Sequence, residues 1–125
     1  MKIAVSAEGD TLTSIMDMRF GRAPYFIMID TDTGEYEAVD NGAAQSSGGA
    51  GIAAAQMLVD KGIKILITGN VGPNAMKVLT AGDIPVYGGR QSTVRENMEA
   101  YNTGLLEKID TTVPAHFGLG GQGRR

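Results

Sequence analysis

The sequence predicts an α/β protein with a five-stranded mixed sheet and helices on both of its faces. A short apolar run at residues 3–6 predicts a buried first strand. Residues 63–68 show no polar alternation, which is typical of a central parallel strand. From residue 50 onward, helical and strand segments alternate, as crossover connections between parallel strands require. The predicted order is three strands, then helix, strand, helix, strand and helix.

The segment between the first strand and the first helix predicts a loop and a hairpin. Residues 8–19 scatter Thr, Ser and Asp among a few bulky side chains, so we expect a loop. Residues 24–31 are rich in aromatic and β-branched side chains and predict the second strand. Gly34 can adopt the left-handed conformation of a turn. Residues 35–41 are therefore expected to return as the exposed edge strand of a hairpin.

The first two helices are marked by their ends. Residues 50–61 are apolar nearly all round, which indicates a well-buried helix, and Gly62 stands just past its end. Gly72 and Pro73 open the second helix, because proline is pre-organised for a first helical turn. Gly82 is expected to end it.

A capping box marks the third helix. Residues 84–87 predict the fifth strand, which precedes it. Thr93 can accept a hydrogen bond from the backbone of Glu96, while the Glu96 side chain reaches back to the Thr93 N–H. Gly104 is expected to stop this helix.

Composition limits the classes of function. We expect a single domain over residues 1–110 and a flexible Gly/Arg-rich tail over residues 111–125. The net charge of −3 argues against a nucleic-acid or membrane partner. The absence of cysteines excludes disulfides, thiolate catalysis and cysteine-ligated clusters, and it fits a cytoplasmic location. No apolar run approaches the ~20 residues that span a bilayer.

Glycine turns and arginines are expected to meet at one edge of the sheet. If the fourth and fifth strands run parallel to the first, the turns after them lie at the carboxyl edge, where ligands of open α/β sheets bind. Backbone N–H groups of the glycine turns and arginine side chains would then form an anion-binding cleft. The alternative is that the glycines only make turns and the arginines pair with surface carboxylates. The candidate residues are Arg19, Arg22, Gly48, Gly49, Gly69, Gly72 and Arg90.

Other chemistries have weaker signals. Residues 49–54 match the loose dinucleotide pattern G-x-G-x-x-A, but no strand leads directly into them, so helix capping explains the glycines better. The first strand carries no carboxylate, so two-metal nuclease chemistry is not expected. His116, the one histidine, is either a metal ligand in the tail or a solvated side chain. We identify no catalytic residue and do not expect an enzyme.

Six sequence blocks, taken together, resemble a known family over about residues 1–110. Their order and spacing are similar to those of the dinitrogenase iron–molybdenum cofactor biosynthesis family, which includes NifX, NafY and the C-terminal domain of NifB. The resemblance implies a ribonuclease-H-like fold, to which the predicted strand order is also similar. The blocks are residues 1–5, 20–26, 30–34, 48–52, 69–75 and 86–87.

The resemblance also implies a non-enzymatic role in binding or carrying a metal–sulfur cofactor. The implied cargo is the iron–molybdenum cofactor or an iron–sulfur precursor, and the implied partner is a protein of cluster assembly. Without thiolates, the chain would hold such a cluster by histidine, by carboxylate, by hydrogen bonds to sulfide or by charge. Two other functions stay open: a protein-interaction module that uses the edge strand at residues 35–41, and a small-anion or nucleotide sensor.

Overall fold

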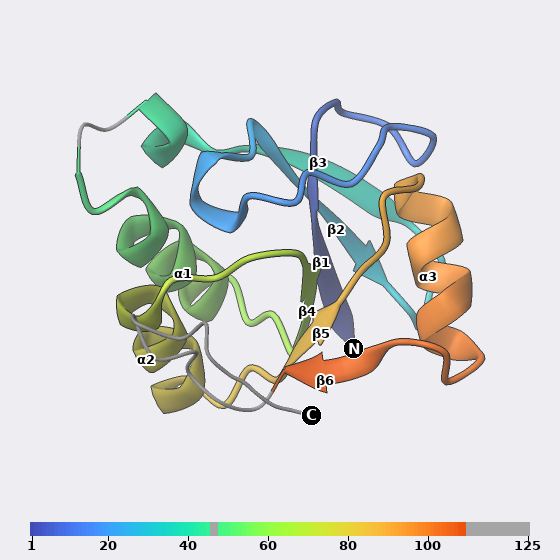
Figure 1. Ribbon diagram of the computed structural model, residues 1–125. Coiled ribbons are helices and arrows are strands. Elements are labelled where there is room, and N and C mark those ends of the chain that lie inside the picture. Colours follow the sequence, from blue (N-terminus) through green and yellow to red (C-terminus); the bar gives the residue numbers. More distant parts are fainter. Residues whose placement is uncertain (46–47, 110–125) are drawn as a thin grey trace.

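The structure is a computed structural model that describes residues 1–45 and 48–109. This part of the chain is built around one mixed sheet (Figure 1). Its six strands run in the order β3-β2-β1-β4-β5-β6. The pairs β1–β4 and β4–β5 are parallel, whereas β1–β2, β2–β3 and β5–β6 are antiparallel. The strands are β1 (Lys2–Ala7), β2 (Tyr25–Asp30), β3 (Tyr36–Asp40), β4 (Ile65–Thr68), β5 (Val86–Gly88) and β6 (Glu107–Ile109).

Helices cover both faces of this sheet, as the sequence predicts. In Figure 1, α1 and α2 lie together on one face and α3 lies on the other. Two short 3-10 helices interrupt the connections: η1 lies between β1 and β2 along the chain, and η2 lies between β3 and α1. The helices are α1 (Ala50–Asp60), α2 (Pro73–Ala81), α3 (Val94–Asn102), η1 (Phe20–Arg22) and η2 (Gly42–Gln45).

The prediction of five strands is wrong, because β6 adds a sixth strand beside β5. Only one of its three residues, Ile109, is apolar, so the segment has neither the alternation nor the apolar run that marks a strand. The sequence does not predict η1 or η2 either, since a single turn carries no periodicity. The mixed α/β class is confirmed, and the likeness to the ribonuclease-H-like architecture stays a prediction.

Local turn and capping signals are confirmed. Gly34 and Gly62 have φ angles of 79° and 75°, in the left-handed region that glycine adopts without strain. Thr93 and Glu96 form the reciprocal hydrogen bonds of a capping box at the start of α3. These short-range signals fix where the elements begin and end.

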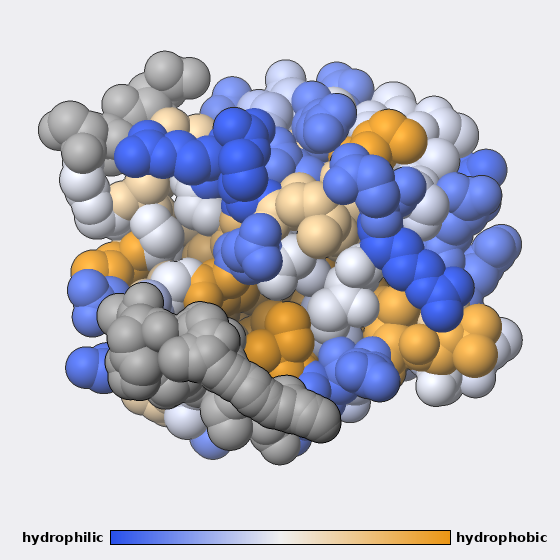
Figure 2. All heavy atoms as spheres, in the orientation of Figure 1, coloured by the Kyte–Doolittle hydropathy of each residue, from blue (hydrophilic) through white to orange (hydrophobic). Residues whose placement is uncertain are grey.

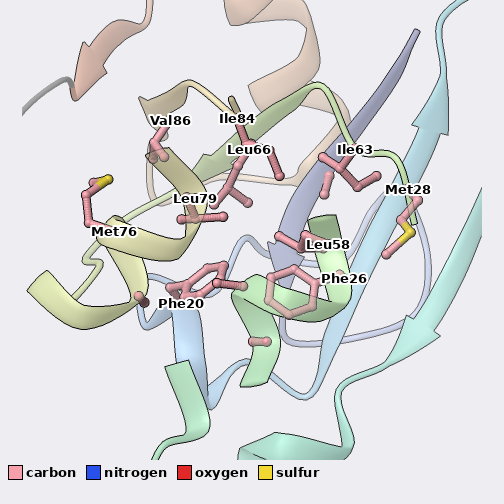
Figure 3. Close-up of a cluster of buried hydrophobic side chains, with 14 residues drawn as sticks. Phe20, Phe26, Met28, Leu58, Ile63, Leu66, Met76, Leu79, Ile84 and Val86 are labelled. Carbon is pink, nitrogen blue, oxygen red and sulfur yellow. The ribbon is translucent and has the colours of Figure 1, made fainter. Parts of the chain in front are cut away.

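The pleat of the strands divides the apolar side chains between two cores. In β1, Ala4 faces α1 and α2, whereas Ile3 and Val5 face α3. Phe20 of η1 reaches the core on the α1/α2 side, where its ring centroid lies 5.4 Å from that of Phe26 (Figure 3). This aromatic pair anchors η1 over the sheet on the side of α1 and α2.

Within residues 1–45 and 48–109, no helix combines the length and the apolar character needed to cross a membrane. The predicted tail at residues 111–125, with His116, lies outside the described residues. The predictions for the tail therefore stay predictions.

A matched pair of alanine variants in α1 tests the core. Leu58 is fully buried against the sheet, whereas Ile52 is 44% exposed. We expect Leu58→Ala to lower the free energy of unfolding by about 2–5 kcal/mol, because it leaves a cavity. Ile52→Ala should change it by less than about 1 kcal/mol. Denaturant titration of both variants measures the difference, and equal losses would contradict the packing.

Candidate functional site

The carboxyl ends of β1, β4 and β5 meet at one edge of the sheet, named here the carboxyl edge. The segment between β1 and β2 folds back across it and pairs with the turn after β4. The Asn70 N–H donates to the Met18 carbonyl at 2.6 Å, and the Phe20 N–H donates to the Asn70 carbonyl at 3.2 Å. This exchange places η1 beside the turn that leads into α2, so residues far apart in sequence share one site.

Gly69 allows the close approach at this crossing. A Cβ atom built on Gly69 would lie 2.5 Å from the Met18 carbonyl oxygen, which no side chain tolerates without a shift of backbone. The Gly72 position in the same turn has no atom within 4 Å of a built Cβ. Two glycines that the sequence places in one anion-binding turn therefore differ: Gly69 is packed and Gly72 is open.

The starts of α1 and α2 lie side by side beneath η1. A Cβ atom on Gly21 would lie 2.9 Å from both the Cα and the backbone N of Gly51, so η1 rests on the first turn of α1. Gly51 in turn contacts α2, because its built Cβ would lie 3.3 Å from the Ala75 Cβ. Two helices with the same direction thus present their positive ends at the carboxyl edge.

Neither of these helix starts is closed by a side chain. Gly49 and Gly72 are the N-cap residues, and neither can supply a capping oxygen. The first N–H groups that bond to the cap carbonyls are those of Ala53, which donates to Gly49, and Met76, which donates to Gly72, both at 3.0 Å. Several N–H groups before them have no acceptor within the described residues. This donor cluster comprises the N–H groups of Ala50, Gly51, Ile52, Asn74 and Ala75.

The start of α3, by contrast, is closed. The Glu96 N–H donates to Thr93 Oγ1 at 3.0 Å. The N–H groups of Val94 and Arg95 donate to carbonyls of the loop between β1 and η1, each at 2.9 Å. Three helices therefore begin at the carboxyl edge, and two of them keep donors available for a ligand.

Arg19 is held at this edge by a buried carboxylate. Its Nη2 and Nε donate to Asp17 at 2.9 and 3.1 Å, and its backbone N–H donates to the same group at 2.9 Å. The Arg19 side chain stays 66% exposed, while that of Asp17 is 3% exposed. Burial raises the pKa of the Asp17 carboxyl, but the hydrogen bonds and charge of Arg19 outweigh burial and lower it below its ordinary value.

The two other candidate arginines lie on opposite sides of the sheet. Arg22 ends η1 on the α1 side, where its Nη1 donates to the Ala44 carbonyl at 2.9 Å. Arg90 follows β5 on the α3 side, where its backbone N–H donates to Asn97 Oδ1 at 2.7 Å and its Nη2 lies 3.5 Å from the Leu105 carbonyl. The structure therefore groups Arg22 with the donor cluster and places Arg90 on the other face.

Gly48 and Gly49 are exposed beside the start of α1, with no atom within 4 Å of a built Cβ. Gly49 has a φ of 72°, which explains glycine at this cap. In the orientation of Figure 1, hydrophilic residues predominate over the upper part of the surface, and apolar residues are more frequent lower down (Figure 2).

Buried polar groups that the sequence does not single out hold the loops of this edge in place. Ser6 Oγ lies 2.7 Å from the Asp17 carbonyl and 2.6 Å from Thr68 Oγ1, so it ties the loop to β4. Asn41 donates to the Ala23 carbonyl at 2.8 Å. The short spacing of Asp17 and Arg19 is the one sequence signal that points to such an anchor.

The donor cluster and the arginines favour an anion, and the described residues do not favour a bare metal ion. No group of three or more His, Asp or Glu side chains able to hold a metal ion occurs within residues 1–45 and 48–109. The chain contains no cysteine. The site can therefore neutralise and hydrogen-bond a ligand, but its described side chains do not form a coordination sphere.

Comparison with known proteins identifies a family and several relatives. Residues 1–104 match the family model described as dinitrogenase iron-molybdenum cofactor. The chain is 28% identical over 113 residues to MJ0580, an uncharacterized protein of Methanocaldococcus jannaschii, with 88% of this chain and 92% of that protein covered.

Two solved structures are similar in both sequence and fold. The apo form of the orange protein from Desulfovibrio gigas is 42% identical, with a TM-score of 0.83, over 86% of this chain and 92% of that one. A Thermotoga protein whose name ties it provisionally to NifB is 38% identical, with a TM-score of 0.81, over 91% and 97%.

Alanine at the two turn glycines tests the crossing. Gly69→Ala should lower the free energy of unfolding by about 1–3 kcal/mol, because its Cβ would meet the Met18 backbone. Gly72→Ala, in open space, should cost less than about 1 kcal/mol, the loss of a preferred N-cap residue. Thermal or chemical unfolding compares them, and equal costs would contradict the packed crossing.

Acid titration tests the anchor of Arg19. Because the folded pKa of Asp17 is lowered, its stabilising contribution is present above the unfolded pKa of about 3.9 and is lost as pH falls through the folded value. We expect Asp17→Asn to destabilise the protein by about 1–3 kcal/mol at neutral pH. The difference from the native protein should shrink in acid, and a difference independent of pH would contradict the ion pair.

Proposed function

Because the chain belongs to the dinitrogenase iron–molybdenum cofactor family, we propose that it binds and carries an anionic metal–sulfur cofactor or its precursor. The cargo would sit at the carboxyl edge, over the starts of α1 and α2. The observation that carries this proposal is the donor cluster, in which five backbone N–H groups have no acceptor among residues 1–45 and 48–109. Such donors at paired helix ends favour a multiply charged anion.

The kind of contact available restricts the cargo. The described side chains hold no metal-ligating group of three, and the chain has no thiolate, so the cluster would arrive with its own ligands. Backbone N–H groups would then donate to sulfide, and Arg22 would offset part of its charge. Arg19, whose charge Asp17 already balances, would contribute hydrogen bonds from its exposed guanidinium. A role of this kind is binding and transfer without catalysis, in the cytoplasm, with an assembly protein as giver or receiver.

A small-anion sensor remains the second candidate, and one observation favours it. The same donor cluster would serve an oxyanion as well as a sulfide cluster, since both accept hydrogen bonds and carry negative charge. The two functions differ in which anion binds more tightly.

Anaerobic titration with isolated iron–molybdenum cofactor tests the proposal. The purified protein should retain stoichiometric metal through gel filtration, and Arg22→Ala should weaken binding about tenfold, because it removes a charge beside the donor cluster. Arg90→Ala, on the α3 side, should weaken it less. Arg95→Ala, at an exposed position of α3, is the matched control and should bind the cofactor as the native protein does.

Three outcomes would contradict the proposal. Complete loss of metal on the column would remove the cargo role. Equal weakening by Arg22→Ala and Arg95→Ala would leave only a general charge effect. Weak competition between inorganic phosphate and the cofactor is expected at any anion site. If phosphate instead prevents cofactor binding completely, at concentrations far below those that displace anions from an unrelated site, the small-anion sensor is favoured.

A further inference from the structure

The outer edge of β3 is open within the described residues. β3 is the first strand of the sheet order, at the end opposite β6, and β2 is its only partner strand among residues 1–45 and 48–109 (Figure 1). Four of its five residues are exposed, and Val39 is half-buried. A five-residue strand with one free side is long enough to receive another strand.

The register of the hairpin shows which backbone groups point outward. The Asp30 N–H donates to the Glu35 carbonyl and the Asn41 N–H donates to the Pro24 carbonyl, both at 2.9 Å. In an antiparallel pair, inward-facing residues alternate with outward-facing ones. The N–H and C=O groups of the residues between them therefore face away from β2. These residues are Tyr36, Ala38 and Asp40.

The charge of this hairpin selects the partner. Residues 30–41 contain five acidic residues and no Lys or Arg. Asp30 and Asp32 face the N-terminal ammonium at 4.0 and 2.9 Å, whereas Glu35 and Glu37 form no ion pair within the described residues. A second copy of the same strand would bring like charges together, but a basic strand would form opposite-charge pairs across the new ladder.

A hollow beside the edge fits a basic side chain. It has a volume of about 250 Å³ and lies on the face of the sheet that carries Glu37. Three carboxylates line it against one ammonium, that of Lys2, so the lining is acidic on balance and would attract a cation. Its apolar and aromatic walls would receive the aliphatic stem of Lys or Arg. The hollow is lined by Lys2, Met28, Asp30, Glu35, Tyr36 and Glu37.

We propose that β3 accepts an extended basic segment of another protein as an added strand of the sheet. The ladder forms at Tyr36, Ala38 and Asp40, and a Lys or Arg of the added strand lies opposite Glu37 with its side chain in the hollow. This surface is independent of the proposed cargo site, because it uses neither the donor cluster nor the arginines. The contacts of a partner docked on β3 would therefore not include the donor cluster at the carboxyl edge.

Nuclear magnetic resonance with a defined probe tests this proposal. The isotope-labelled full chain is titrated with a short capped peptide of alternating Lys and Val, and with a matched peptide in which Glu replaces Lys. We expect saturable binding of the Lys peptide alone, weakening as salt rises. The amide protons of Tyr36, Ala38 and Asp40 should gain protection from exchange, because they enter the new ladder.

Three variants distinguish strand addition at β3 from a general electrostatic attraction of the peptide. Ala38→Pro removes an outward N–H at an edge position and should weaken binding at least about tenfold. Glu37→Lys, an exposed charge reversal that leaves the backbone intact, should weaken it about tenfold. Glu99→Lys makes the same charge change at an exposed position of α3 and should leave binding of the Lys peptide unchanged.

The proposal is overturned if both peptides bind equally, if protection appears elsewhere than β3, or if Glu37→Lys and Glu99→Lys behave alike. Protection of the same three amides in the protein alone, growing with its concentration, would overturn it in favour of a second copy of the chain.

Discussion

The close contact between the segment before β2 and the starts of α1 and α2 is the constraint on which the site depends. Gly69 lets the Met18 backbone cross the turn after β4, and Gly21 lets η1 rest on Gly51. Phe20 holds η1 in the core through its contact with Phe26. Without these contacts, the two helix ends would not share one surface with Arg19 and Arg22.

The three helix starts at the carboxyl edge show how the fold separates stability from binding. At α3, the capping box and the loop carbonyls satisfy the first N–H groups, so this end stabilises the fold. At α1 and α2, glycine caps leave donors that find no acceptor in the part of the chain that the structure describes. A site of this design would bind by charge and hydrogen bonds, which suits the proposed cargo, since a carrier must both receive and release it. The edge of β3, at the outside of the sheet, gives a partner a place to dock independently of that cargo.

Local signals in the sequence were sufficient for most elements, and long-range contacts explain the rest. Capping at Thr93 and turns at Gly34 and Gly62 follow from short-range chemistry, so they are predicted correctly. β6 forms by pairing with the edge of β5, which is a long-range contact. Its three residues include one apolar side chain, which is too little pattern to predict a strand. For the site, the sequence predicts an anion edge, but it cannot distinguish packed Gly69 from open Gly72 or place Arg90 on the α3 side. Those differences depend on tertiary contacts.

The most direct measurement is a map of backbone amide signals during anaerobic addition of the iron–molybdenum cofactor to the isotope-labelled protein. A cofactor seated over the starts of α1 and α2 should shift or broaden the amide signals of residues 50–52 and 74–75. It should leave those of residues 94–96 unchanged, because their donors are already used. Changes centred on α3, or no localised change with cofactor bound, would contradict the assignment of the site.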